Sequence, residues 1–204
     1  INEEDLTAFL DKVPSDILVI LDEAYSTYAA QHEGYPNGFR LDYNNLIVMR
    51  TLSKTHGLAG VRIGFAYGPK DLITSLSKVK LPFEPNVLAQ AAALAGLQDD
   101  EFIIQTIETN RRSLEMILEK FDEIGIDYVK PYANFVMTVF PHRDFAADFA
   151  AKCLENGVMV RHVLPFGVPN GVRISTGTIT ETQIALKTFE KVYKELKEKY
   201  PEEK

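Results

Sequence analysis

The segment Arg50–Phe65 reads RTLSKTHGLAGVRIGF, and it decides how the rest of the chain is interpreted. It joins two apolar runs and packs an amine, hydroxyls, glycines and a guanidinium into the connection between them. Short, continuous and β-branched runs of this kind are typical of strands buried on both faces of a sheet. Open α/β sheets bind ligands where such strands end. The segment therefore predicts an α/β sheet with a binding loop at its edge.

Outward from this segment, other runs of the same kind predict further strands, and helical patterns surround them. The strands are expected at residues 16–22, 45–50 and 61–67, and the helices at 3–12, 69–78, 87–97 and 101–121. Asn2 is placed to cap the first helix, and Pro69 opens the second. The order of these elements predicts the α/β fold class.

The pattern changes along the long helix, near residues 100–115. Beyond it, strands are expected at 135–140, 158–161 and 172–175, and a helix at 146–155. A capping box at Thr180–Gln183 is expected to open a final helix that ends near Tyr200. The chain is therefore expected to divide into residues 1–105 and a smaller α/β part, 106–204.

Composition argues against several classes of protein. The net charge of −7 over 204 residues argues against a nucleic-acid or membrane-surface partner. No apolar run approaches the roughly 20 residues of a membrane helix, and no signal peptide is recognised, so a cytoplasmic location is expected. The single cysteine, Cys153, is interpreted as a small buried side chain. The four histidines lack ligand spacing, and no metal site is proposed.

Lys54 is the central candidate in the opening segment. Its amine suits condensation with an aldehyde, and the hydroxyls and Arg62 suit a phosphate dianion. A nearby Arg and a water-poor cleft would destabilise the ammonium form of this amine. The alternative is an ordinary surface lysine, because Ser-Lys pairs are common. A P-loop is excluded, since the glycines follow the lysine instead of preceding it.

Charged residues in or at the ends of the predicted strands are further candidates. Asp22 ends the 16–22 strand, where a carboxylate needs a cationic partner or several donors. The alternative for Asp22 is a capped turn or a structural ion pair. Arg173 lies among alternating apolar residues and should pair with an anion, and Arg161 lies on a neighbouring strand. Two guanidiniums at one mouth suit a dianion, although a surface salt bridge is the alternative for Arg161.

Three segments together resemble one family. They are Asp22-Glu23-Ala24-Tyr25, Thr51–Gly64 and Val172–Thr178. They resemble the pyridoxal 5'-phosphate (PLP) aminotransferases of the aspartate aminotransferase type, fold type I, and within these the histidinol-phosphate aminotransferases most. The resemblance implies the C-terminal part of a PLP-dependent transferase fold, with a three-layer arrangement of sheet and helices and a smaller α/β domain. Residues 1–105 would be the remainder of the large PLP-binding domain, and 106–204 the small C-terminal domain.

The resemblance also implies roles for the candidates. The cofactor-binding residues would be Asp22, Tyr25, Thr51, Ser53, Lys54 and Arg62. Lys54 would be the catalytic residue, which binds PLP covalently and then moves a proton. Asp22 would pair with the pyridine nitrogen and Tyr25 with the phenolate oxygen, while the two hydroxyls and Arg62 would hold the phosphate.

For the substrate, the resemblance implies that Arg173 grips its anionic end, with Arg161 as a second candidate. His56 lies two residues from Lys54, where family members carry various residues, and it is expected to support Lys54 without contacting the ligand. Asn134 matches a recurrent Asn-Phe pair, and it receives no role. The loop at residues 81–86 departs from the Pro-Phe-Asn-Val-Asn expected there, so the exact substrate stays open.

The activity implied is transamination of histidinol phosphate with 2-oxoglutarate in histidine biosynthesis, by an enzyme that is a homodimer at full length. Members of the family are nearly twice this length, so the chain is expected to be a fragment that binds PLP weakly alone. The alternatives are an aromatic amino-acid aminotransferase or a phosphoamino-acid decarboxylase on the same fold. A rival of another class is a non-catalytic binding module, against which the presence of Lys54, Asp22 and Arg62 argues.

Overall fold

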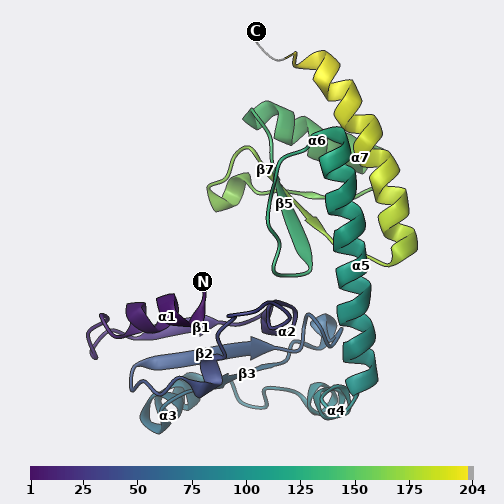
Figure 1. Cartoon of the computed structure of the whole chain (residues 1–204). Helices are drawn as coiled ribbons and strands as arrows, with labels where there is room; N and C mark the ends of the chain where they lie inside the picture. Colours follow the sequence, from purple (N-terminus) through teal and green to yellow (C-terminus); the bar gives the residue numbers. More distant parts are fainter. Residues whose placement is uncertain (202–204) are drawn as a thin grey trace. The chain divides into compact units, whose positions relative to one another are not determined.

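The chain forms two compact units, residues 1–107 and 108–204, in a computed structural model that describes residues 1–201 (Figure 1). The division falls within the long helix α5 (Asp100–Ile124). Each unit has its own sheet, and each is described by itself.

The first unit is built on a three-stranded sheet in the order β1-β2-β3. The strands are β1 (Val19–Asp22), β2 (Leu46–Thr51) and β3 (Gly64–Tyr67). β1 and β2 are parallel, and β2 and β3 are antiparallel. The helices of this unit are α1 (Glu3–Leu10), α2 (Ser26–Ala29), α3 (Lys70–Val79) and α4 (Val87–Gly96), with 3-10 turns at Gly38–Arg40 and Ala59–Val61.

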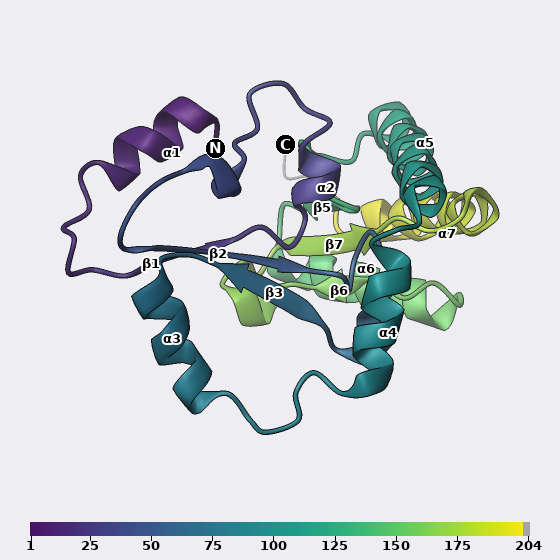
Figure 2. The same cartoon turned by 90° about the horizontal axis from the view of Figure 1, so that it is seen from below.

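Helix α1 covers one face of this sheet, and α3 and α4 lie on the other side (Figure 2). Leu6 and Leu10 of α1 pack with Leu46 and Val48 of β2 in a small buried core. The helix begins as expected, because the Asn2 side chain accepts a hydrogen bond from the N–H of Asp5 at 2.7 Å. Helix, sheet and helix form the three layers that the sequence predicted.

The expectation that the strands are buried on both faces is wrong for β1 and β3. Ile20 is 56% exposed, and every residue of β3 is exposed. Ile47 on the central strand is buried, so α3 and α4 cover only part of their face of the sheet. The apolar runs are typical of a sheet that is covered on both faces, whereas within this unit residues of β1 and β3 remain exposed.

Strand β3 starts three residues later than predicted. The 3-10 turn at Ala59–Val61 occupies the start of the predicted strand, and Arg62 then adopts a left-handed conformation with φ 56°. A strand cannot pass through a residue in that region of backbone space. The strand pairing begins only at Gly64, which lies opposite Thr51.

The second unit has a four-stranded antiparallel sheet in the order β4-β5-β7-β6. The strands are β4 (Tyr128–Val129), β5 (Phe135–Val139), β6 (Arg161–His162) and β7 (Gly171–Ser175). Helices α6 (Arg143–Glu155) and α7 (Ile179–Lys199) pack with the C-terminal part of α5 on one face of this sheet. The core between them is rich in phenylalanine and includes Phe121, Phe149 and Phe189.

Two boundary predictions in this unit need correction. The strand expected at 158–161 is reduced to Arg161–His162, because only those two residues pair with β7. The capping box of the last helix lies at Thr178 and Glu181, two residues before the expected position. Cys153 is fully buried as predicted, and burial raises the pKa of its thiol to about 12.

Across residues 1–201, no helix combines the length and apolar character needed to cross a membrane. Within the same residues, no group of three or more His, Cys, Asp or Glu side chains is arranged to hold a metal ion.

Candidate active site

The two parallel strands of the first unit end side by side, and each ends on a candidate residue. Asp22 is the last residue of β1, and Thr51 is the last residue of β2. The carboxyl ends of parallel strands form one edge of a sheet, and ligands bind at that edge in open α/β sheets. The fold thus gathers the segments after both strands at a common edge.

The segment after β1 brings Tyr25 to Lys54. Oδ1 of Asp22 accepts a hydrogen bond from the N–H of Ala24 at 3.0 Å, which stabilises the turn into α2. Nζ of Lys54 lies 5.1 Å from the centroid of the Tyr25 ring, within the range of a cation–π contact. Lys54 and Tyr25 are half-buried, whereas Asp22 is exposed. Among the described residues Asp22 thus accepts one turn-forming hydrogen bond, and its pairing with a ring nitrogen stays a prediction.

The segment after β2 gathers the three residues expected to hold a phosphate. The N–H of Ser53 donates to Oγ1 of Thr51 at 3.0 Å. Nη1 of Arg62 lies 3.4 Å from Oγ of Ser53 and donates to the carbonyl oxygen of Ala59 at 2.9 Å. Two hydroxyls and a guanidinium from separate parts of the segment are thus brought together.

Arg62 is held in a way that favours an anionic ligand. Its positive φ is uncommon for a residue other than glycine, and such conformations cluster at functional sites. Its side chain is exposed, and among residues 1–201 no carboxylate forms an ion pair with it. An exposed cation next to two hydroxyls is a suitable site for a phosphate.

Buried residues flank Lys54 in its segment. Leu52 and Thr55 are buried on either side of Lys54. The hydroxyls of Thr55 and Tyr28 share a hydrogen bond, and burial raises the pKa of Tyr28. This bond links α2, which follows Tyr25, to the residue that follows Lys54.

His56 lies two residues after Lys54. Its Nδ1 atom is buried, and it has no hydrogen-bond partner among the described residues. Burial lowers the pKa of this imidazole. The position agrees with a supporting role near the lysine, which stays a prediction.

Sequence reasoning missed an ion pair between the buried Glu23 and the partly buried Arg50. These residues stand next to Asp22 and Thr51, and their charged groups are 2.7 Å apart. The available signal was a charged residue at the end of each of two apolar strands. Only the parallel pairing of those strands shows that the two charges meet.

In the second unit, the two substrate candidates are direct neighbours. Arg161 of β6 lies opposite Arg173 of β7 in the antiparallel register. Opposite residues project from the same face of a sheet, and like charges in this position are destabilising. Each guanidinium lies over an aromatic ring, at 4.9 Å from Phe166 for Arg161 and at 4.5 Å from Phe135 for Arg173. A dianion bound between them would relieve the repulsion.

Asn134 has a structural role in this unit. Its carbonyl oxygen accepts hydrogen bonds from the N–H of Thr176 at 3.0 Å and from the Thr176 hydroxyl at 3.1 Å. The bonds fix the chain just after β7, which carries Arg173. Both bonds are made by the main-chain oxygen of Asn134, so they give no role to its side-chain amide.

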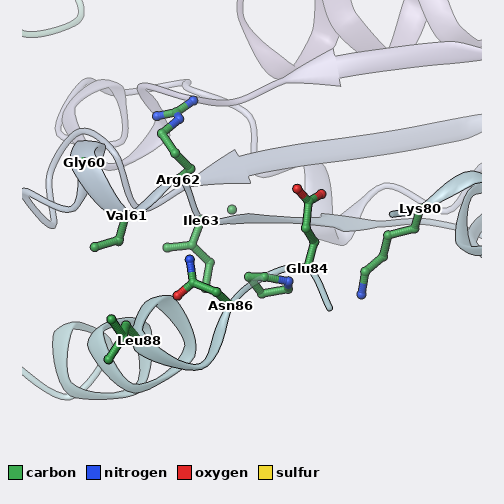
Figure 3. A pocket seen from close by; sticks show the side chains of 10 residues that line it. Gly60, Val61, Arg62, Ile63, Lys80, Glu84, Asn86 and Leu88 are labelled. Atoms are coloured by element: carbon green, nitrogen blue, oxygen red, sulfur yellow. The ribbon is translucent and has the colours of Figure 1, made fainter. Parts of the chain in front are cut away.

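A cavity of about 770 Å³ opens next to Arg62, one of the residues expected to bind the phosphate. Its lining includes residues 60–64 at the start of β3, Glu84 and Asn86 of the 81–86 loop that departs from the family pattern, and Lys80 just before that loop. Figure 3 shows the Arg62 side chain directed away from Val61, Ile63 and Leu88, which face the cavity. Arg62 also lines this cavity, and its guanidinium lies within hydrogen-bonding distance of Ser53.

Comparison with known proteins identifies the family. Residues 1–189 match the family model described as aminotransferase class I and II. The histidinol-phosphate aminotransferase of Anoxybacillus flavithermus is 35% identical over 206 residues, which cover 100% of this chain and 54% of that protein. The chain spans about half the length of the curated relatives it matches.

Solved structures give the same result. The histidinol-phosphate aminotransferase of Sinorhizobium meliloti, in complex with pyridoxal-5'-phosphate, superposes with a TM-score of 0.88 at 26% identity. The match covers 96% of this chain and 54% of that chain. An aromatic aminotransferase from Pyrococcus horikoshii also matches, with a TM-score of 0.81, 26% identity, and coverage of 97% of this chain and 57% of that chain.

Proposed function

The chain belongs to the class I and II aminotransferases, and on that premise we propose that it carries the PLP-binding and substrate-binding residues of a histidinol-phosphate aminotransferase. The amino group acceptor would be 2-oxoglutarate. The single observation that carries the proposal is the convergence of Lys54, Ser53 and Arg62 at the end of β2, with Tyr25 against the lysine. The names of the relatives support the choice of substrate.

The residues at the end of β2 fit a phosphate-bearing aldehyde. A guanidinium without a carboxylate partner in residues 1–201, two hydroxyls and a primary amine form the donor set that such a ligand requires. When bound, PLP supplies an aldehyde that condenses with amines and a ring that accepts electrons from the substrate carbon. Thr51, Ser53 and Arg62 would bind its phosphate.

The other residues would then control protons and orientation. Asp22 would keep the ring nitrogen protonated, because a carboxylate at hydrogen-bonding distance stabilises the cationic form. The Tyr25 hydroxyl would donate a hydrogen bond to the phenolate oxygen. The amine of Lys54, once released, would move a proton to and from the substrate carbon as a general base and acid.

Arg161 and Arg173 would bind the phosphate of the substrate. The two arginines lie directly opposite each other on β6 and β7, so both guanidiniums are on one face of the sheet. Two cations on one face favour binding of a dianion, such as a phosphate, over binding of a monoanion. An aromatic amino-acid aminotransferase is the second candidate function, and the similarity to the Pyrococcus horikoshii enzyme favours it. A phosphoamino-acid decarboxylase would use the same phosphate contacts.

The experiment uses the full-length protein that contains these residues. The protein is incubated with PLP, reduced with borohydride and mapped by peptide mass spectrometry, with Lys54→Ala as the control. A pyridoxyl adduct on Lys54 supports the proposal, and an adduct on other lysines alone rejects it. Amino transfer from histidinol phosphate is then compared with transfer from phenylalanine and with release of carbon dioxide from phosphoamino acids. Faster transfer from phenylalanine would favour the aromatic enzyme.

The proposal extends to organisation and location. Residues 1–105 would be the remainder of the large PLP-binding domain and 106–204 the small domain, in a homodimer located in the cytoplasm. Exposed apolar side chains in the first unit support a protein interface, among them Phe83, which is 96% exposed, and Leu88. Light scattering on the full-length protein tests the dimer, and a monomeric mass would reject it.

A further inference from the structure

Glu23 is a buried carboxylate with no place among the cofactor-binding candidates. It follows Asp22 directly and is 2% exposed. Its Oε2 accepts a hydrogen bond from Nε of Arg50 at 2.8 Å and lies 2.7 Å from Nη2 of the same guanidinium. Its Oε1 accepts the N–H of Gly38 at 2.8 Å. The carboxylate thus joins the end of β1 to the end of β2 and to the 3-10 turn at residues 38–40.

Arg50 is fixed in turn by that same turn. Its Nη2 donates to Oδ1 of Asn37 at 3.0 Å, and this oxygen also accepts the N–H of Phe39 at 3.2 Å. The central carbon of the guanidinium lies 3.8 Å from the centroid of the Phe39 ring. The guanidinium is therefore held at its edge by polar groups and on its face by an aromatic ring.

A pair of this kind is an inefficient way to stabilise a fold. The Glu23 carboxylate is fully removed from water and the Arg50 side chain is 25% exposed, so desolvation offsets much of their attraction, and well-packed apolar residues of similar volume often serve as well. In this pair the hydrogen bonds of both charged groups are defined, so its contribution here is a fixed geometry. The geometry fixed here is that of the two strand ends.

Alternation along the strands carries this restraint to the candidate site. Successive residues of a strand project from opposite faces. Glu23 and Arg50 lie on the face covered by α1, so Asp22 and Thr51 project from the other. The N–H of Glu23 also donates to the carbonyl oxygen of Met49 at 2.9 Å, which continues the pairing of β1 and β2 up to the ion pair. Any shift of either strand end would displace the Asp22 carboxylate or the Thr51 hydroxyl.

We propose that Glu23 and Arg50 are a positioning pair, which fixes the separation between the carboxylate of Asp22 and the phosphate-binding hydroxyl of Thr51. The inference rests on the proposed function, because a rigid ligand that is held at a ring nitrogen and at a phosphate makes that separation important. Neither residue of the pair would touch the ligand in this arrangement. Both act through the residues beside them.

The test uses the full-length protein and three variants. Glu23→Gln keeps the volume and removes the charge, and Glu23→Gln with Arg50→Met removes the pair altogether. Thr182→Val is the matched control, because Thr182 and Ser113 form a buried hydroxyl pair at 2.7 Å in the second unit. For each protein, the measurements are the urea midpoint, the dissociation constant of PLP from fluorescence titration, and the pH midpoint of the bound cofactor's absorbance.

Both Glu23 variants are expected to raise the PLP dissociation constant about tenfold or more and to move the pH midpoint, since small misplacements of binding groups weaken a site by such factors. The double variant should bind no more weakly than Glu23→Gln. Thr182→Val should lower the urea midpoint and leave PLP binding within about twofold of the wild type. Binding and pH midpoints at wild-type values in both Glu23 variants, with only stability reduced, would overturn the positioning pair. A wild-type protein that forms no adduct at Lys54 would instead count against the proposed function.

Discussion

Substitution of Gly38 by alanine should destabilise the first unit strongly, because its position leaves no space for a side chain. A Cβ atom at Gly38 would lie 2.7 Å from Oε1 of Glu23, 2.9 Å from a methyl carbon of Leu21 and 2.9 Å from one of Val48. None of these atoms is free to move away. The carboxylate is held in the ion pair, and the two methyl groups belong to neighbouring strands of the sheet.

The magnitude follows from two contributions. Overpacking of a filled core costs about 1–3 kcal/mol. Displacement of the Gly38 N–H from Glu23 loses a buried hydrogen bond to a charged group, which costs about 1–3 kcal/mol. Against these, alanine reduces the entropy of the unfolded chain and returns about 0.4–1 kcal/mol. With the middle of each range, the free energy of unfolding should fall by about 3 kcal/mol.

Gly60→Ala is the matched control for this measurement. A Cβ atom at Gly60 would meet nothing within 4 Å, and Gly60 has no positive φ. Its urea midpoint should equal that of the wild type or exceed it slightly. With a denaturant slope of about 1–2 kcal/mol per molar, the midpoint of Gly38→Ala should fall by at least ~1 M urea, followed by circular dichroism. Equal midpoints for the two alanine variants would refute the close contacts on which the reasoning depends.

Three further substitutions test the second unit. Thr178→Ala removes the capping box shared with Glu181 and should lower the free energy of unfolding by about 1 kcal/mol in urea titrations, and an unchanged midpoint would contradict the cap. Lys199 holds the pKa of the Asp148 carboxyl below its usual value of 3.8, so the pair stabilises the fold above that pH and loses its effect as the pH falls further. Asp148→Asn should therefore lower the urea midpoint near neutral pH, and the difference from the wild type should shrink as the pH falls below about 4; a constant difference would rule this out. Arg173→Met should raise KM for histidinol phosphate about tenfold or more and leave PLP affinity unchanged, whereas an unaltered KM would remove this arginine from the substrate site.

The strands and helices were predicted well where local pattern determines them. Each predicted strand is present at least in part, because β-branched and aromatic residues favour the extended backbone that strand pairing requires. The ends were less predictable, and Arg62 shows why. Its left-handed conformation is set by the 3-10 turn before it and by the pairing of Gly64 with Thr51, and both depend on tertiary contacts. The residue type did not indicate a positive φ here, because arginine seldom adopts one.

The candidate residues were predicted individually, but the contacts between them were not. Arg161 and Arg173 were expected on neighbouring strands, and the register places them directly opposite each other. A slip of one residue would send one of them to the other face, and no local signal distinguishes the two registers. The contact between Glu23 and Arg50 spans 27 residues and depends on the parallel pairing of two strands.

The position of the ion pair explains how an exposed site can keep its geometry. Asp22 and Arg62 are exposed, and ion pairs or hydrogen bonds between exposed side chains contribute little free energy to holding those side chains in place. A restraint that held them in place from the solvent side would compete with the ligand for the same polar atoms. The restraint instead lies on the opposite face of the sheet, in the charges of Glu23 and Arg50, and reaches the site through the backbone. The groups that bind the ligand remain available, while the strand ends that carry them are held by groups that the ligand does not contact.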